Sequence, residues 1–166
     1  MRVVQVVNAL FSDSDFIRRA NVISKMKGGW ERWFQMELAY TIAKDYVGTY
    51  DITLEDNTVY PGTALRADLV LQSRILAKTT TVVELKCQVA TASTEDFYNL
   101  IEADIGKIPA LALGNDYQVI ALVRDRDDVE PLYHALAVAH PNQISGYTFP
   151  GNLSTPGGFV SFYQEG

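Results

Sequence analysis

The chain has one cysteine, no long apolar run and no excess of basic residues, and each shortage excludes a class of protein. Cys87 alone can form neither an intramolecular disulfide nor a cysteine-only zinc cluster. No apolar run approaches the roughly 20 residues that a helix needs to cross a bilayer. The apolar content of 48% and the charged content of 20% are those of an ordinary globular protein. A cytoplasmic location is the default expectation for such a composition.

The charge balance is acidic. Fourteen Lys and Arg residues face twenty Asp and Glu residues, which leaves a net charge of -6. Proteins that bind nucleic acid through its phosphates usually carry a basic excess, so this balance argues against tight, non-specific DNA binding. Divalent cations held by carboxylates would neutralise part of the acidity.

The pattern of elements predicts one mixed α/β domain over residues 1–166. The sequence has no repeat and no linker, although Gly and Pro concentrate after Pro141. We expect helices over 13–25, 30–46, 94–113 and 130–140, with Pro109 ending or kinking the third. Strands are expected over 50–54, 66–72, 80–88, 117–124, 146–149 and 158–164, and residues 2–10 fit a strand or a short helix. The core, residues 30–124, is a helix, a three-strand meander, a helix and a strand, and a helix and edge strands over 125–166 complete a central sheet flanked by helices.

Two of the expected interior strands carry charged residues at their centres. Residues two apart on a strand share a face, so Glu84, Lys86 and Gln88 project together while Cys87 faces the core on the other side. A hairpin centred near residue 76 would place Asp68 directly opposite Glu84. Two carboxylates and an ammonium group would then meet on one face of the sheet.

This grouping suits the hydrolysis of a phosphodiester with the help of a metal ion. Facing carboxylates repel each other unless a cation lies between them. Their oxygen atoms suit Mg²⁺ or Mn²⁺, which take one or two carboxylates and keep several waters. Lys86 would orient the attacking water or stabilise charge on the phosphate.

Asp68, followed after fifteen residues by Glu84-Leu85-Lys86, resembles the motif of the PD-(D/E)xK nuclease superfamily, which has the restriction-endonuclease-like fold. Ala67 stands where the family name has proline. The resemblance implies that Asp68 and Glu84 bind Mg²⁺ or Mn²⁺ together with the carbonyl of Leu85, and that Lys86 is the catalytic lysine. The family core of helix, meander, helix and strand corresponds to residues 30–124.

The same resemblance extends to two further positions. Glu37 lies on the helix before the meander, where many family members carry a glutamate, and it shares the face of Trp30, Phe34 and Leu38. The resemblance implies that Glu37 binds the metal directly or through its outer shell. Gln88 matches a glutamine that often follows the ExK element, although a glutamine at the end of a strand is also commonplace.

The implied function is a nuclease that cuts DNA rather than RNA, acting as a homodimer or with an accessory subunit. Two other interpretations stay open. Asp68, Glu84 and Lys86 could form a cross-strand ion pair on a solvated face. The chain could also be a non-catalytic nuclease-fold module that serves as a binding or assembly subunit, which the acidic balance favours. Asp104 and Lys107 on the following helix are expected to be surface charges, with Lys107 able to face a phosphate.

Overall fold

The computed structural model describes residues 3–26, 30–75, 79–148 and 157–166. These residues form five α-helices: α1 (Val3–Leu10), α2 (Ser14–Ile23), α3 (Trp30–Asp45), α4 (Thr94–Ile105) and α5 (Arg126–Ala139). They also form six strands: β1 (Tyr50–Asp56), β2 (Ala67–Ser73), β3 (Thr80–Cys87), β4 (Asn115–Val123), β5 (Ile144–Thr148) and β6 (Gly158–Gln164). In this part of the chain, no helix combines the length and the apolar character needed to span a membrane.

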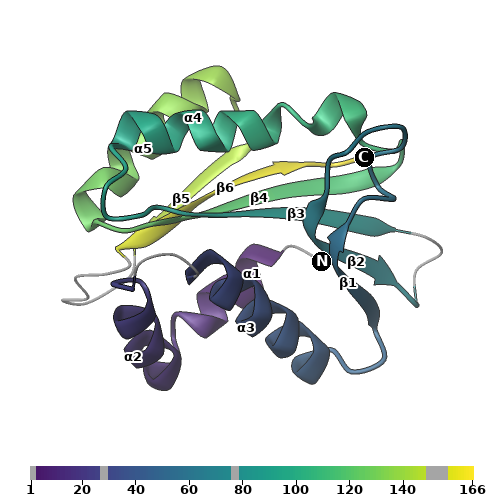
Figure 1. Ribbon diagram of the computed structural model, residues 1–166, viewed down its shortest axis with the longest axis horizontal. Helices are drawn as coiled ribbons and strands as arrows, with labels where there is room; N and C mark the ends of the chain where they lie inside the picture. The colour runs from purple at the N-terminus through teal and green to yellow at the C-terminus, as the bar shows by residue number, and fades with distance from the viewer. Residues whose placement is uncertain (1–2, 27–29, 76–78, 149–156) are drawn as a thin grey trace.

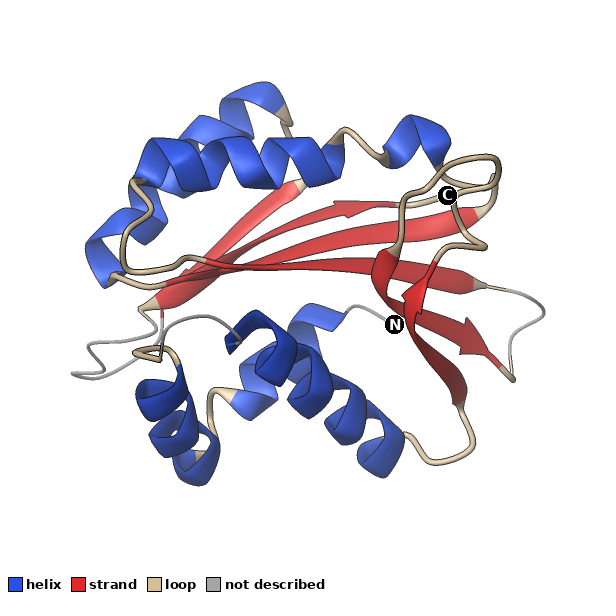
Figure 2. Ribbon diagram, viewed as in Figure 1, coloured by secondary structure: helices blue, strands red, loops and turns tan. Residues whose placement is uncertain are grey.

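The strands form one open mixed sheet between two layers of helices. Their order is β1-β2-β3-β4-β6-β5, and of the neighbouring pairs β3 and β4 run parallel while the others run antiparallel. Helices α1, α2 and α3 cover one face of the sheet, and α4 and α5 cover the other (Figures 1 and 2). The predicted α/β class with a central mixed sheet is therefore confirmed.

Each face of the sheet carries its own apolar core, and β3 contributes to both. Val83, Leu85 and Cys87 pack in the cluster under α1 and α3, whereas Val82 packs in the cluster under α4 and α5. This alternation is the one predicted for β3, and it directs the side chain of Glu84 toward the α4 layer.

The β2–β3 hairpin has the predicted register but opens before it reaches Asp68. Leu69 pairs with Val83, which centres the hairpin on residue 76, and this is the last pair of the ladder on that side. Ala67 packs under α4 while Leu69 packs under α3, although residues two apart in a regular strand share a face. The backbone of β2 therefore bends at Asp68. We call the resulting gap between β2 and β3 the fork.

Several element boundaries differ from the predicted ones. The segment 2–10 forms a helix, α1, from Val3 onward. Helix α4 begins at a capping box formed by Ser93 and Asp96, but it ends at Ile105, and Pro109 lies in a separate 3₁₀ turn. Helix α5 begins at Arg126, four residues earlier than expected. The predicted strand 146–149 corresponds to β5, and its last residue lies outside the described residues.

Candidate metal site at the fork

Asp68 lies at the bend of β2 and holds the fork open. Its Oδ2 accepts a hydrogen bond from the backbone N–H of Leu85 at 2.7 Å, at the point where the backbone ladder has stopped. The carbonyl of Asp68 accepts a hydrogen bond from the side-chain amide of Gln35, on α3. β3 thus holds the carboxylate of Asp68, and α3 holds its backbone carbonyl.

Glu31 from the first turn of α3 makes the equivalent contact one step further along β3. Its Oε2 accepts a hydrogen bond from the backbone N–H of Cys87 at 3.0 Å. Leu85 and Cys87 are two residues apart, so their N–H groups point to the same edge of β3. Carboxylates from two different elements therefore satisfy consecutive donors along this edge.

The sequence predicts Glu37 as the metal-binding carboxylate of this helix, but the structure brings Glu31 to the fork instead. Glu37 forms an ion pair with Arg19 at 3.2 Å and lines a depression with Trp33 and Tyr40. Six residues of α-helix correspond to a rotation of about 240°, so Glu31 and Glu37 cannot share a face. The position of Glu31 opposite Cys87 identifies it as a site residue, but this position is known only once α3 is packed on β3.

The mouth of the fork is a pocket of about 330 Å³. It is lined by Glu31, Arg32, Gln35, Glu55, Asp68 and Leu85. Within the described residues, Oδ1 of Asp68 has no hydrogen-bond partner, and Oε1 of Glu31 has only the ammonium of Lys86 at 4.0 Å. Each carboxylate therefore keeps one oxygen available for a ligand.

Burial and crowding of like charges act on both carboxyl groups. Loss of solvent raises the pKa of Asp68 and of Glu31 above their ordinary values. The negative charge of Asp68 raises the pKa of Glu31 further, and that of Asp104 raises the pKa of both. A cation placed between Asp68 and Glu31 would relieve this repulsion.

A chain of alternating charges leads from the fork into the α4 layer. Lys86 Nζ lies 4.0 Å from Glu31 and 3.0 Å from Asp104. Asp104 lies 2.9 Å from Lys107, and Lys107 lies 3.0 Å from Oε2 of Glu84. We call these five residues the charge chain. Burial alone would lower the pKa of Lys86, but Asp104 and Glu31 raise it above its ordinary value and keep the ammonium charged.

Glu84 ends the charge chain in the interior and is not among the residues that line the pocket. It is 1% exposed, and its Oε1 accepts a hydrogen bond from the Tyr60 hydroxyl at 2.6 Å while Oε2 faces Lys107. Burial raises the pKa of Glu84 to about 7, against the opposing effects of Tyr60 and Lys107. Asp104 is only 3% exposed, so the expectation that it is a surface charge is wrong.

The structure gives Gln88 partners away from the fork. Its side-chain oxygen accepts a hydrogen bond from the backbone N–H of Arg124 at 2.9 Å, and its amide donates to Asp128 on α5 at 3.2 Å. Asp128 also accepts a hydrogen bond from Thr94 at 3.0 Å. Gln88 thus ties the end of β3 to β4, α4 and α5.

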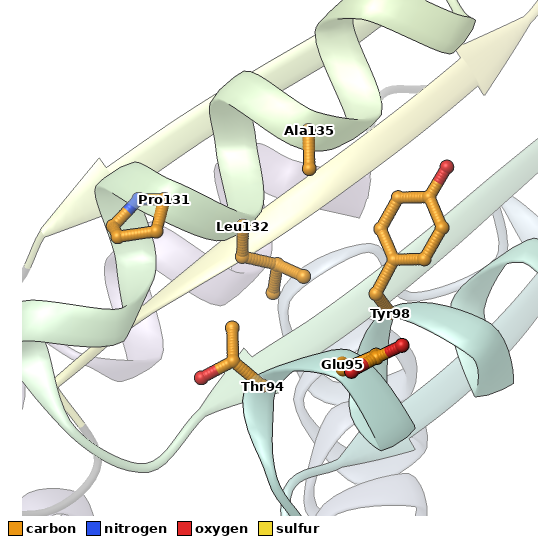
Figure 3. A pocket seen from close by; sticks show the side chains of 6 residues that line it. All are labelled: Thr94, Glu95, Tyr98, Pro131, Leu132 and Ala135. Carbon is orange, nitrogen blue, oxygen red and sulfur yellow. The ribbon is translucent and has the colours of Figure 1, made fainter.

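A further pocket of about 260 Å³ lies between α4 and α5, and the residues that line it are all drawn in Figure 3. They are Thr94, Glu95, Tyr98, Pro131, Leu132 and Ala135. None of the predicted site residues lines this pocket, so it does not bear on the chemistry of the fork.

The donors at the fork form an all-oxygen set that fits a hard divalent cation. Asp68 and Glu31 each offer one carboxylate oxygen that accepts no hydrogen bond from the described residues, and the backbone carbonyl of Leu85 lies beside them and accepts a hydrogen bond from Lys86 at 3.1 Å. No group of three or more His, Cys, Asp or Glu side chains in the described ranges converges on a metal-binding geometry. Two carboxylates and a carbonyl are oxygen donors of the kind that Mg²⁺ takes, with water in its remaining positions.

Comparisons of the chain with protein-family models, with curated proteins and with solved structures find no significant match.

Proposed function

We propose that the chain is a metal-dependent phosphodiester hydrolase, a nuclease whose active site is the fork. The charge count at the fork supports this proposal most. Glu31, Asp68, Asp104 and Glu84 carry four negative charges when they are ionised, whereas Lys86 and Lys107 carry two positive charges. Among the described residues of this cluster, negative charges therefore exceed positive charges by two beside an open pocket, and one divalent cation would balance them.

In this proposal Asp68 and Glu31 hold Mg²⁺ or Mn²⁺ together with the carbonyl of Leu85. The bound ion supplies Lewis-acid polarisation of the phosphate. Lys86, held between Glu31 and Asp104, is positioned to orient the attacking water or to stabilise charge on the phosphate. Arg32 at the rim of the pocket, which pairs with Glu55 at 2.6 Å, would have to exchange this partner to contact the phosphate backbone.

Glu84 acts at a distance from the substrate in this scheme. It holds Lys107, which in turn holds Asp104, so that Lys86 keeps its place and its charge. The motif that suggested the function thus contributes Asp68 in the wall of the pocket, Lys86 beside it next to Glu31 and the Leu85 carbonyl, and Glu84 as a positioning residue. Direct binding of the metal by Glu84 would require its Oε2 to leave Lys107.

The element order supports the same proposal. Helix α3, the meander β1–β2–β3, helix α4 and strand β4 follow in the sequence expected of the restriction-endonuclease-like core. The resemblance to the PD-(D/E)xK nuclease superfamily implies that the substrate is DNA in preference to RNA. It also implies that a homodimer or an accessory subunit selects the target.

The test is a cleavage assay with supercoiled plasmid, single-stranded DNA and RNA in Mg²⁺ or Mn²⁺. We expect the parent protein to cleave a DNA substrate, with activity lost in chelator and lowered at least about 100-fold by Asp68→Asn or Lys86→Met. Glu37→Gln is the matched control and should retain full activity, because Glu37 pairs with Arg19. Absence of cleavage on all three substrates with both metals would refute the proposal.

The second candidate function is a non-catalytic module that kept the fold. The observation that favours it is that both carboxylate oxygens of Glu84 already have partners, one the Tyr60 hydroxyl and the other Lys107. A buried residue held in this way can serve stability alone. In that case the protein would bind no divalent cation, and Lys86→Met would change its stability but no activity.

A further inference from the structure

Arg32 and Glu55 form an ion pair at the mouth of the fork. Nη1 of Arg32, in the first turn of α3, lies 2.6 Å from Oε1 of Glu55, on β1. Both residues line the same pocket as Asp68 and Glu31. Their side chains are 55% and 42% exposed, so a ligand that enters the pocket from solvent meets this pair.

Gln35 connects the pair to the fork. Its buried side chain accepts a hydrogen bond from Nη1 of Arg32 at 2.6 Å and donates one to Oε1 of Glu55 at 3.2 Å. The same amide nitrogen donates to the backbone carbonyl of Asp68. The side chain that holds Arg32 and Glu55 in place therefore also holds the backbone of Asp68, a metal-binding residue of the proposed site.

The backbone of Glu55 has an unusual conformation beside Asp68. The register that pairs Leu54 with Leu69 places Glu55 opposite Asp68, and the ladder between β1 and β2 skips this position. Glu55 has φ of 55°, in the left-handed region, which is unfavourable for a residue with a side chain. Such conformations gather at binding and catalytic sites, so the orientation of Glu55 points to a function at this pocket.

The ion pair is of a kind that a phosphate can replace. One oxygen of Glu55 contacts one nitrogen of Arg32, and half-exposed pairs with a single contact contribute little to stability. Within the described residues, the hydrogen bonds of Arg32 involve Nη1, so the edge formed by Nε and Nη2 can bind two phosphate oxygens. Two anions on one guanidinium group repel each other, and a bound phosphate would therefore displace Glu55.

We propose that Arg32 binds a backbone phosphate of the DNA strand, and that Glu55 pairs with Arg32 in the free protein until this phosphate displaces it. Glu55 thereby keeps the guanidinium group beside the pocket and lowers the affinity for ligands that cannot displace it. The identity of the phosphate, as a neighbour of the cleaved bond, rests on the proposed function of the fork.

The experiment measures the binding of a fluorescein-labelled single-stranded oligothymidylate by fluorescence anisotropy. EDTA separates binding from cleavage, and low salt is used because phosphate contacts weaken steeply as salt increases. We expect Arg32→Gln to lower the affinity at least fivefold, and Glu55→Gln, which keeps the side-chain volume, to raise it at least threefold. Arg32→Gln should also reduce the magnitude of the slope of log affinity against log salt by about 0.7, the value of one phosphate contact on a single strand.

Asp51 and Arg74 supply the matched controls, because they form another half-exposed ion pair between β1 and an arginine, near the other end of the strand. Asp51→Asn and Arg74→Gln change the net charge in the same two ways and should each alter the affinity less than twofold. The double variant Arg32→Gln/Glu55→Gln measures whether the two residues act together. We expect Glu55→Gln to have no effect in the Arg32→Gln background, since no cation is left to release.

The inference is overturned if the parent shows no saturable binding, or if either single variant at the pair binds as the parent does. It is also overturned if Glu55→Gln tightens binding equally in both backgrounds, which would indicate simple repulsion between Glu55 and the strand. Cleavage with an unaltered KM in Arg32→Gln would overturn this inference alone. The expected coupling between the two residues in a protein that cleaves no substrate would overturn the proposed function alone.

Discussion

Glu84 is the residue whose environment differs most from that of a surface ion pair. It is buried with Tyr60 on one oxygen and Lys107 on the other. Removal of a buried acceptor leaves its donor unsatisfied, which costs more than the loss of a surface contact. The two substitutions at this position should therefore differ strongly.

We expect Glu84→Ala to lower the free energy of unfolding by about 1–3 kcal/mol, because the buried hydroxyl of Tyr60 loses its acceptor. Glu84→Gln should cost clearly less, since the amide oxygen still accepts a hydrogen bond from Tyr60 and the side-chain volume is kept. Urea denaturation of both variants measures the difference. Equal losses in the two variants would show that the charge chain does not stabilise Glu84.

At the scale of single residues, the sequence identified three of the groups that the structure places at the fork. Asp68 and Lys86 were predicted from the charges within apolar strands and from the period of two, and the carbonyl of Leu85 from the family resemblance. Glu31 was missed because a carboxylate in the first turn of a helix is usually a response to the helix dipole. Lys107 was expected only as a surface charge, since nothing local indicates that Glu84 lies beside it.

At the scale of elements, the fork between β2 and β3 carries the site. The register of the hairpin was predicted from its midpoint, but the bend at Asp68 was not. Glu55 on β1, close to the bend, has φ of 55°, in the left-handed region that non-glycine residues seldom adopt. A bend of this kind depends on contacts between strands, so local sequence patterns do not predict it.

Substitution of Gln88 tests whether this residue stabilises the fold or takes part in catalysis. Gln88→Ala leaves the N–H of Arg124 without its acceptor and removes one of the two side-chain donors to Asp128, so we expect a loss of about 1–3 kcal/mol in unfolding free energy. The activity per folded molecule should be unchanged, because Gln88 does not line the fork. Denaturation and cleavage assays on the same preparation measure both. A selective fall in kcat with unchanged stability would restore its predicted catalytic role.

At the scale of the whole molecule, the order of elements and the mixed sheet followed from hydrophobic periods and turn residues, while the ends of α4 and α5 did not. Pro131 lies inside α5, where a proline is usually unfavourable, and so the helix start was predicted too late. The sequence also did not predict that charged side chains are buried under α4. Asp104 and Glu84 are far apart in the chain and meet only when α4 packs on β3.

The stability of the whole protein should depend on pH through these carboxyl groups. The pKa of Glu84 is raised from 4.5 to about 7, so the folded state favours its protonated form. The resulting stabilisation is complete below pH 4.5 and is lost as the pH rises through 7. The pKa values of Asp68 and Glu31 are raised in the same direction.

In EDTA we therefore expect the melting temperature to fall between pH 5 and pH 8 by an amount on the order of 5 °C. Saturating Mg²⁺ should reduce this fall, because the cation replaces the protons as the compensating charge. In EDTA, the melting temperature of Glu84→Gln should depend less on pH than that of the parent protein. Thermal melts across the pH range measure all three, and a melting temperature that rises steadily toward pH 8 in EDTA would contradict the assignment.

The central claim is that Asp68 and Glu31 hold a divalent cation at the fork, and Mn²⁺ binding measured by calorimetry tests it most directly. The account predicts one Mn²⁺ per chain, with affinity that falls on acidification as the carboxyl groups take up protons. Asp68→Asn and Glu31→Gln should each abolish this binding, while Glu37→Gln leaves it unchanged. Absence of Mn²⁺ binding in the parent, or binding that survives Asp68→Asn, would contradict the account.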